Sequence, residues 1–166
     1  MILFAYAANM DMGKFVKIVP SAKKIDIAKL PGYDFVFGLR GKDESSKASI
    51  TPSADLDAAV WGVLIELSDD ERDNFFNPDP ETNDLILEAV TCIAEDGKAY
   101  EAEAFIAKPH AFNSYLLPFD WYHERIIKLT QQAGLPHEYI DRLTAMPFKK
   151  DTDEQRAARR RKNWGL

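Results

Sequence analysis

The chain contains 166 residues, of which 46% are apolar, and it carries a formal net charge of −6. This length suits one domain with a substantial core and is short for two, so we expect a single domain over residues 1–150 and a charged tail over residues 151–166. Binding to duplex nucleic acid needs a basic surface, so the negative charge argues against such a partner and favours a small ligand.

The first element is an apolar run over residues 2–7 that ends just before Asn9. Such a run predicts a buried strand that leads directly into a loop, where binding sites often lie. It has no basic segment or cleavage site typical of a signal peptide, and no apolar run in the sequence approaches the roughly 18 residues of a membrane span. We therefore expect a cytoplasmic protein without a membrane partner.

Short β-type segments separated by turn residues follow. Residues 24–30, 33–39 and 48–51 have the composition of strands. Residues 58–67 are apolar on both faces, which predicts a strand in the middle of a sheet.

A polar region comes next. Ser68 precedes three acidic residues as a helix N-cap does, so we expect a short helix up to about residue 76. Residues 77–84 contain two prolines and no apolar side chain, which predicts a loop.

The clearest strand pair is formed by residues 85–93 and 100–107, which flank the turn Asp96-Gly97. An Asp-Gly turn between two such segments predicts a β-hairpin. The first segment contains Cys92, the single cysteine, so no disulfide framework exists and a reducing compartment is expected. We expect this cysteine to lie in the core.

After Pro109 the apolar pattern takes a helical period up to Gly134, and Pro136 opens a further helix. The three histidines lack the spacing of metal ligands, so we expect them to be exposed and predict no metal site. Short strands followed by helices predict an α+β fold with a strongly curved, barrel-like sheet.

The tail contains a cluster of basic residues: Arg156, Arg159, Arg160, Arg161 and Lys162. Such a cluster is typical of a solvated helix or a frayed terminus, with a weak contact to an anionic partner as the alternative.

Several segments, taken in order, carry a resemblance: Phe4-Ala5-Tyr6-Ala7-Ala8-Asn9-Met10, Leu30-Pro31-Gly32-Tyr33-Asp34-Phe35, Val60-Trp61-Gly62-Val63-Leu64 and Gly134-Leu135-Pro136 with Tyr139-Ile140. Together they resemble the motifs of γ-glutamylcyclotransferase-like (AIG2-like) proteins over about residues 1–146. The resemblance implies a mixed β-barrel with peripheral helices and a cavity at the strand ends. Members of the family convert γ-glutamyl amines or γ-glutamyl amino acids to 5-oxoproline and release the amine without a cofactor. A small γ-glutamyl substrate, no cofactor and a monomer or homodimer are therefore expected.

In that reaction the substrate's own α-amine attacks its γ-carbonyl, so the protein supplies no nucleophile and instead folds the substrate into a near-attack ring. The resemblance makes the main chain of Tyr6, Ala7, Ala8, Asn9 and Met10 the candidate cradle for the oxyanion and the α-carboxylate. Alanines stand at the family's glycine and serine positions. Ala7 adds a Cβ where glycine would permit a positive φ and close ligand approach. Ala8 lacks the serine hydroxyl that could bind a ligand or cap the next helix. An ordinary strand-to-helix turn with Asn9 as N-cap is the alternative.

A carboxylate must move a proton from the attacking amine to the leaving amine. The family carries it in a Leu-Asp-x-x-Glu-Gly motif, which this chain lacks. Counting forward from residue 67 places Asp79 at the glutamate, and counting back from the hairpin places Pro78 there. Glu81 fits after a two-residue slip and keeps the reach of glutamate. A solvated acidic loop is the alternative for both.

Two further residues are candidates. Alternation places Glu88 on one strand face with Val90 and Cys92, where a buried carboxylate would suit acid–base chemistry, with a position at a strand edge or in an ion pair as the alternative. Tyr122 matches the family's helix tyrosine, whose hydroxyl would face the cavity, with core packing as the alternative. Phe119 replaces a nearby serine of the family, so we expect a more apolar cavity.

Two other functions remain open. The chain could be a catalytically degenerate family member that binds a small amine- or carboxylate-bearing ligand without turnover, or an interaction protein that uses its basic tail.

Overall fold

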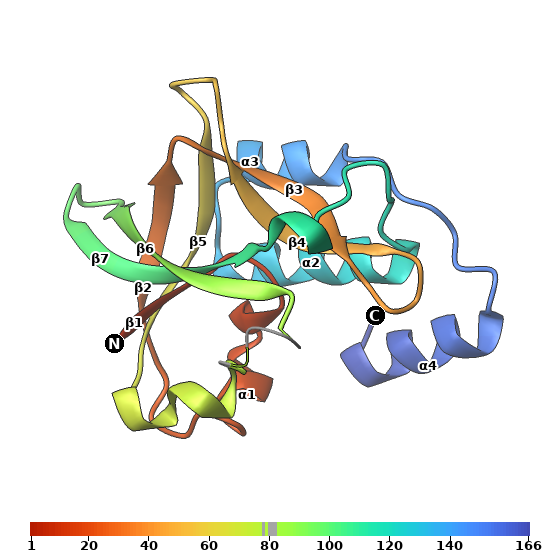
Figure 1. The fold of residues 1–166 in the computed structure, drawn as a ribbon, viewed down its shortest axis with the longest axis horizontal. Coiled ribbons are helices and arrows are strands. Elements are labelled where there is room, and N and C mark those ends of the chain that lie inside the picture. Colours follow the sequence, from red (N-terminus) through yellow and green to blue (C-terminus); the bar gives the residue numbers. More distant parts are fainter. Residues whose placement is uncertain (78, 80–82) are drawn as a thin grey trace.

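The computed structural model describes residues 1–77, 79 and 83–166 and shows a β-barrel with helices outside it (Figure 1). The barrel strands, in spatial order, are β1 (Ile2–Ala5), β5 (Ala59–Glu66), β2 (Lys23–Pro31), β6 (Leu85–Ala94) and β7 (Ala99–Ala107). Neighbouring strands are antiparallel except at the closure, where β1 and β7 are parallel. The predicted α+β class, with a mixed and strongly curved barrel, is therefore confirmed.

A second, two-stranded sheet lies beside the barrel. It consists of β3 (Tyr33–Arg40) and β4 (Ser46–Pro52), which pair in antiparallel register. The main-chain N–H of Ala107 at the end of β7 donates to Ser49 Oγ of β4 at 3.1 Å, which ties this sheet to the barrel.

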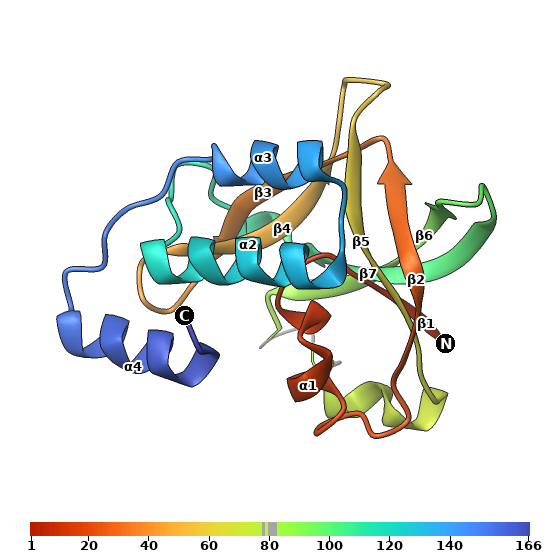
Figure 2. The ribbon, with the colours of Figure 1, turned by 180° about the vertical axis from the view of Figure 1, so that it is seen from behind.

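The longer helices follow the strands in the chain: α2 (Asp120–Ala133), α3 (His137–Thr144) and α4 (Glu154–Trp164). Helices α2 and α3 run side by side behind β3 and β4 (Figures 1 and 2). Helix α2 ends as its pattern predicts, because Gly134 has a φ of 79° and the Leu135 N–H bonds back to the Thr130 carbonyl at 3.1 Å. None of the helices in the described part of the chain is long and apolar enough to span a bilayer.

Short helical segments lie in the connections: η1 (Ala8–Met10), α1 (Met12–Phe15), η2 (Asp69–Asn74) and η3 (Pro109–Ala111). The first two follow β1 directly, so the first strand leads into a tight turn as predicted. The segment after Ser68 is a 3₁₀ helix, and the Ser68 hydroxyl bonds to the Asp70 carboxylate instead of capping a main-chain amide.

Strand β5 forms the centre of the core. It lies between β1 and β2, and Val60, Val63, Leu64 and Ile65 are almost fully buried, which explains why it is apolar on both faces. A Cβ on Gly62 would lie 2.6 Å from the Ala5 carbonyl oxygen, so only glycine lets β5 approach the end of β1 this closely. This close packing fixes the point at which the chain leaves the barrel for η1.

Two predictions about single residues have different outcomes. Cys92 is fully buried, as expected. The prediction of exposed histidines is wrong for His123, which is buried, bonds through Nε2 to the Leu143 carbonyl at 2.9 Å and stacks on Phe148. Its helical position faces α3, and that packing could not be read from histidine spacing alone.

The basic tail forms α4, which lies against α2. The Trp164 ring is 5.3 Å from the buried Trp121 ring, and Ala157 is buried beside them. Asp151, just before α4, is buried and accepts hydrogen bonds from Trp121 Nε1 at 2.8 Å and from Arg156 Nε at 2.7 Å. The tail is therefore an ordered helix with one packed face.

Candidate functional site

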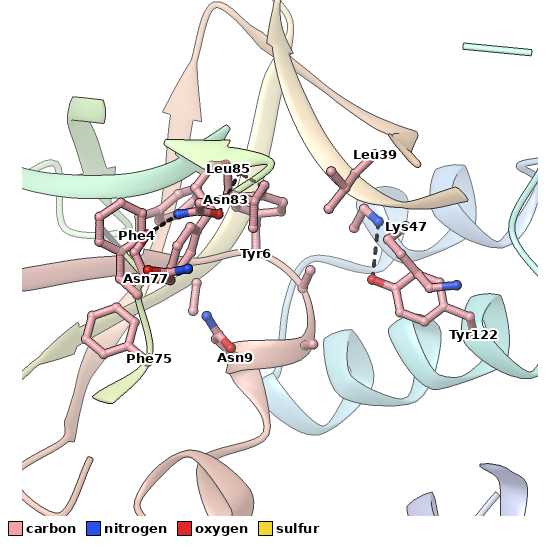
Figure 3. Close-up of a pocket in the computed structure, with 16 residues that line it drawn as sticks. Phe4, Tyr6, Asn9, Leu39, Lys47, Phe75, Asn77, Asn83, Leu85 and Tyr122 are labelled. Carbon is pink, nitrogen blue, oxygen red and sulfur yellow. Dashed lines mark hydrogen bonds between the residues drawn. The ribbon is translucent and has the colours of Figure 1, made fainter. Parts of the chain in front are cut away.

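A cavity of about 260 Å³ lies at the end of β1, between the barrel and α2 (Figure 3). Its lining comes from segments far apart in the sequence: the turn after β1, the β3–β4 sheet, the end of η2, the start of β6, β7 and α2. The lining residues are Phe4, Ala5, Tyr6, Ala7, Ala8, Asn9, Leu39, Lys47, Ala48, Phe75, Phe76, Asn77, Asn83, Leu85, Phe105 and Tyr122.

Tyr6 anchors the turn that was predicted as a substrate cradle. Its ring is buried, and its hydroxyl donates to the Phe105 carbonyl on β7 at 2.5 Å. Burial raises the pKa of this phenol, so the hydroxyl stays protonated and serves as a donor. Tyr6 therefore ties the end of β1 to the neighbouring strand β7.

The next residues form the wall itself. Ala7 has a φ of −143°, so the turn does not need the positive φ that glycine permits and the alanine Cβ is compatible with it. The carbonyl of Ala7 accepts the Met10 N–H at 2.9 Å, which begins η1. A helix start leaves its leading amides without partners inside the helix, so the N–H groups of Ala8 and Asn9 are the donors that this wall can offer.

Asn9 and Met10 differ in their surroundings. The Asn9 side chain lies at the cavity (Figure 3), whereas Met10 is buried in the core and is not among the lining residues. The alternative role of Asn9 as N-cap is not observed. Asp11 caps α1 instead, because its Oδ1 accepts the Lys14 N–H at 3.2 Å.

The predicted acidic loop borders the same cavity. Asn77 and Asn83 line it, on the side of Asn9 away from Lys47 and Tyr122 (Figure 3). Asp79 lies between these two asparagines: its N–H donates to Asn77 Oδ1 at 3.0 Å, and its carbonyl accepts the Asn83 N–H at 3.1 Å. The Asp79 side chain is exposed and is not among the lining groups, and Glu81 and Pro78 lie outside the described residues.

Glu88, the third candidate acid, is exposed on β6 and is not among the lining residues, so it is not the buried carboxylate that was considered for acid–base chemistry. Alternation does place it on the face of Val90 and Cys92. However, β2 covers β6 only near its end, where Ala28 and Lys29 pair with residues 93 and 94, so the first half of β6 extends beyond that neighbour.

Lys47 is the one charged side chain among the described lining residues, and the sequence analysis did not single it out. Its Nζ lies 3.0 Å from both carboxylate oxygens of Asp43 and 2.6 Å from Ser45 Oγ. Burial lowers the pKa of this ammonium, and Asp43 opposes the shift. The Asp43 carboxylate therefore balances the Lys47 charge.

Tyr122 has the core packing that was the alternative to a hydroxyl facing the cavity. Its ring is buried in the core and lines the cavity, and its hydroxyl accepts the Ala48 N–H of β4 at 3.2 Å. Burial raises the pKa of the phenol. Tyr122 thus joins α2 to the β4 wall.

The aromatic wall was not predicted as part of the site. The Phe105 ring meets the Phe75 ring at 6.0 Å and the Phe76 ring at 5.9 Å, and all three line the cavity. Phe119, expected to make the cavity more apolar, is instead buried beside Trp121 and is not among the lining residues. The pair Phe75-Phe76 directly before the acidic loop was the available sequence signal.

In the part of the chain that the structure describes, no group of three or more His, Cys, Asp or Glu side chains is arranged to hold a metal ion.

No protein-family model matches the chain, and no curated protein sequence matches it. Solved structures do. A γ-glutamyl cyclotransferase superposes with a TM-score of 0.76 at 21% identity, over 96% of this chain and 98% of its own. The human protein described as uncharacterized protein loc79017 superposes with a TM-score of 0.73 at 21% identity, over 95% and 97% of the two chains. YkqA from Bacillus subtilis superposes with a TM-score of 0.72 at 18% identity, over 89% of this chain and 55% of its own. These likenesses confirm the fold expected from the resemblance.

Proposed function

We propose that this chain, which has the fold of γ-glutamylcyclotransferase-like proteins, is a member of that family and an enzyme of the cyclising type. It would convert a γ-glutamyl amine or amino acid to 5-oxoproline and release the amine. One observation carries the proposal: the turn after β1 and the ends of the acidic loop line the same cavity. We further propose that the loop between Asn77 and Asn83 brings a carboxylate to this cavity, opposite the main-chain donors, as the cyclisation needs.

The proposed reaction begins at the substrate's α-ammonium. A carboxylate of the acidic loop, Asp79 or Glu81, takes its proton, and the free amine attacks the γ-carbonyl carbon to close a five-membered ring. The amides of Ala8 and Asn9 stabilise the oxyanion of the tetrahedral intermediate. The ring nitrogen gives up a second proton, and the bond to the leaving amine breaks as that nitrogen is protonated by the carboxylic acid. The products are 5-oxoproline and the amine as its ammonium ion, which carries both protons lost by the attacking nitrogen, so atoms and charges balance without a cofactor.

The test is the release of 5-oxoproline from a panel of γ-glutamyl amides by the purified protein. We expect turnover by the wild type and a loss of about 10²–10⁴-fold in kcat when the acid/base is removed, by Asp79→Asn or by Glu81→Gln. Glu88→Gln is the matched control, because this acid lies on the adjoining strand outside the cavity, and it should retain full activity. Full activity in both loop variants would remove these two residues from the mechanism.

A second function is supported by the charge of the cavity. Among the described lining residues no carboxylate is present, and Lys47 is balanced by Asp43. Without an acid in this wall, a protein would hold a small amine- or carboxylate-bearing ligand on the main-chain donors after β1 and would not turn it over. Absence of 5-oxoproline across the panel, together with a ligand-dependent rise in the melting temperature, would establish binding alone.

We place this activity in the cytoplasm. The support is the single cysteine, which is buried and unpaired and therefore suits a reducing compartment.

A further inference from the structure

The wall of the cavity indicates which leaving amine fits it. This inference rests on the proposed function, because it concerns the part of a γ-glutamyl substrate that departs. Next to the acidic loop, Phe75, Phe76 and Phe105 form a contiguous aromatic surface, and Phe4 and Leu85 extend it (Figure 3). The reacting bond would lie between this loop and Asn9, so the amine leaves beside the aromatic rings.

Among the described lining residues, the polar side chains at this end of the cavity are neutral amides. Asn77 and Asn83 supply them, and they lie beside the rings (Figure 3). The ammonium of Lys47 belongs to the other end, where Asp43 and Ser45 bind it. Arg72, whose guanidinium lies over the Phe76 ring at 5.5 Å, pairs with Glu103 at 3.1 Å. Lys47 and Arg72 therefore each have a protein counter-charge, and the described lining residues offer a charged leaving group no unpaired charge.

The volume of the cavity is large enough for a leaving amine with a bulky apolar group. A dry apolar cavity of about 150 Å³ accommodates a benzene ring, and this cavity measures about 260 Å³. The glutamyl part would occupy the rest of the cavity, beside the proposed donors of Ala8 and Asn9. Burial of apolar surface would favour such a ligand, and aromatic rings add edge-to-face contacts.

We propose that the substrates are γ-glutamyl amides of uncharged apolar amines, with an aromatic or branched aliphatic group, and that Phe75, Phe76 and Phe105 determine this specificity. A γ-glutamyl amino acid, whose leaving group carries a carboxylate, is a poorer substrate at this site.

The experiment compares three substrates that share the glutamyl group: γ-glutamyl benzylamide, γ-glutamyl methylamide and γ-glutamylglycine. We expect kcat/KM for the benzylamide to exceed the values for the other two at least tenfold. Phe76→Ala should lower kcat/KM for the benzylamide alone, so the ratio of the benzylamide value to the other two values should approach one. Phe148→Ala is the matched control, since this half-exposed ring stacks on His123 outside the cavity, and it should keep the ratio.

Each outcome decides a different point. Turnover of all three substrates at similar kcat/KM, or an unchanged ratio in folded Phe76→Ala, would overturn the specificity while leaving the proposed function intact. If Phe76→Ala does not fold, Phe105→Leu, which keeps most of the side-chain volume, gives the same test. If no substrate is turned over, the proposed function fails. Calorimetry then tests the specificity: tenfold tighter binding of the benzylamide than of the methylamide supports it, and equal or absent binding overturns it.

Discussion

At the scale of single residues, buried hydroxyl groups fix the walls of the cavity. Strand β4 pairs with β3 irregularly between Phe37 and Leu39, and the Ala48 N–H there donates to the Tyr122 hydroxyl at 3.2 Å. Because this pair is buried, water cannot replace a lost partner. The phenol therefore stabilises both the core and the shape of the site.

Tyr122→Phe removes the acceptor and leaves the Ala48 N–H buried without a partner. We expect the free energy of unfolding to fall by about 1–3 kcal/mol, measured by urea denaturation. Tyr115→Phe is the control, because its side chain is 95% exposed and its loss of a hydroxyl should change nothing. Equal stability of Tyr122→Phe and the wild type would contradict the structural role of this bond.

At the scale of elements, local pattern predicted strands, hairpin and helices well. The Asp-Gly turn and the Gly134 terminus each have a cause within a few residues, and the two apolar faces of β5 can be read directly from its sequence. Failures came where burial depends on a distant neighbour. Alternation gave the correct face for Glu88 but could not show that β2 leaves that part of β6 uncovered. The aromatic wall was missed for the same reason, since its rings come from η2 and β7.

The close contact of β5 with β1 gives a prediction at this scale. Gly62→Ala would place a Cβ 2.6 Å from the Ala5 carbonyl oxygen and 2.8 Å from the Phe4 ring, so one strand must shift. We expect a loss of about 1–3 kcal/mol in unfolding free energy and a lower rate of 5-oxoproline release, because Ala5 leads into the cradle. Gly13→Ala serves as control, since its nearest neighbour would lie 3.7 Å away. Unchanged stability of Gly62→Ala would show that the strands are not packed this closely.

The connection before α4 should make stability depend on pH. Hydrogen bonds from Arg156 outweigh burial and hold the pKa of the Asp151 carboxyl well below its usual range. A carboxyl whose folded pKa is depressed stabilises the fold fully above its unfolded pKa of about 3.9. The stabilisation is lost as the pH falls through the folded pKa.

We therefore expect Asp151→Asn to be less stable than the wild type at pH 7, by about 1–3 kcal/mol. The difference should shrink as the pH falls below about 4. Urea denaturation of both proteins between pH 7 and pH 3 measures it, and a difference that does not vary with pH would contradict the ion pair.

At the scale of the whole molecule, the sequence predicted one barrel domain and a basic tail, and the tail proves to be a helix docked on α2. Its basic side chains suggested a solvated segment. The packed face depends on Trp164 and Ala157, too few apolar positions to outweigh the charges in a pattern analysis. The cavity itself combines residues from Phe4 to Tyr122 that are far apart in the sequence, so its position followed from the family resemblance and not from local pattern.

Truncation after Lys150 tests how this helix contributes. It removes α4 and Asp151 and uncovers Trp121, so we expect a loss of about 2 kcal/mol or more, equivalent to a fall of roughly 4–8 °C in melting temperature for a chain of this size. The barrel should stay folded and keep its activity. Truncation after Asp153 keeps the Asp151 acceptor for Trp121. Its melting temperature should therefore lie between those of the wild type and of the chain truncated after Lys150. An unchanged melting temperature would show that α4 does not support the core.

The central claim is that the turn after β1 holds the glutamyl group opposite the acidic loop. A crystal structure of the Asp79→Asn, Glu81→Gln double variant, which should bind without turnover, in complex with γ-glutamyl benzylamide tests it most directly. We predict the glutamyl carbonyl or carboxylate within hydrogen-bond distance of the Ala8 and Asn9 amides, with the benzyl ring against Phe76 and Phe105. A cavity that stays empty at saturating ligand, or a ligand bound elsewhere on the molecule, would contradict the account.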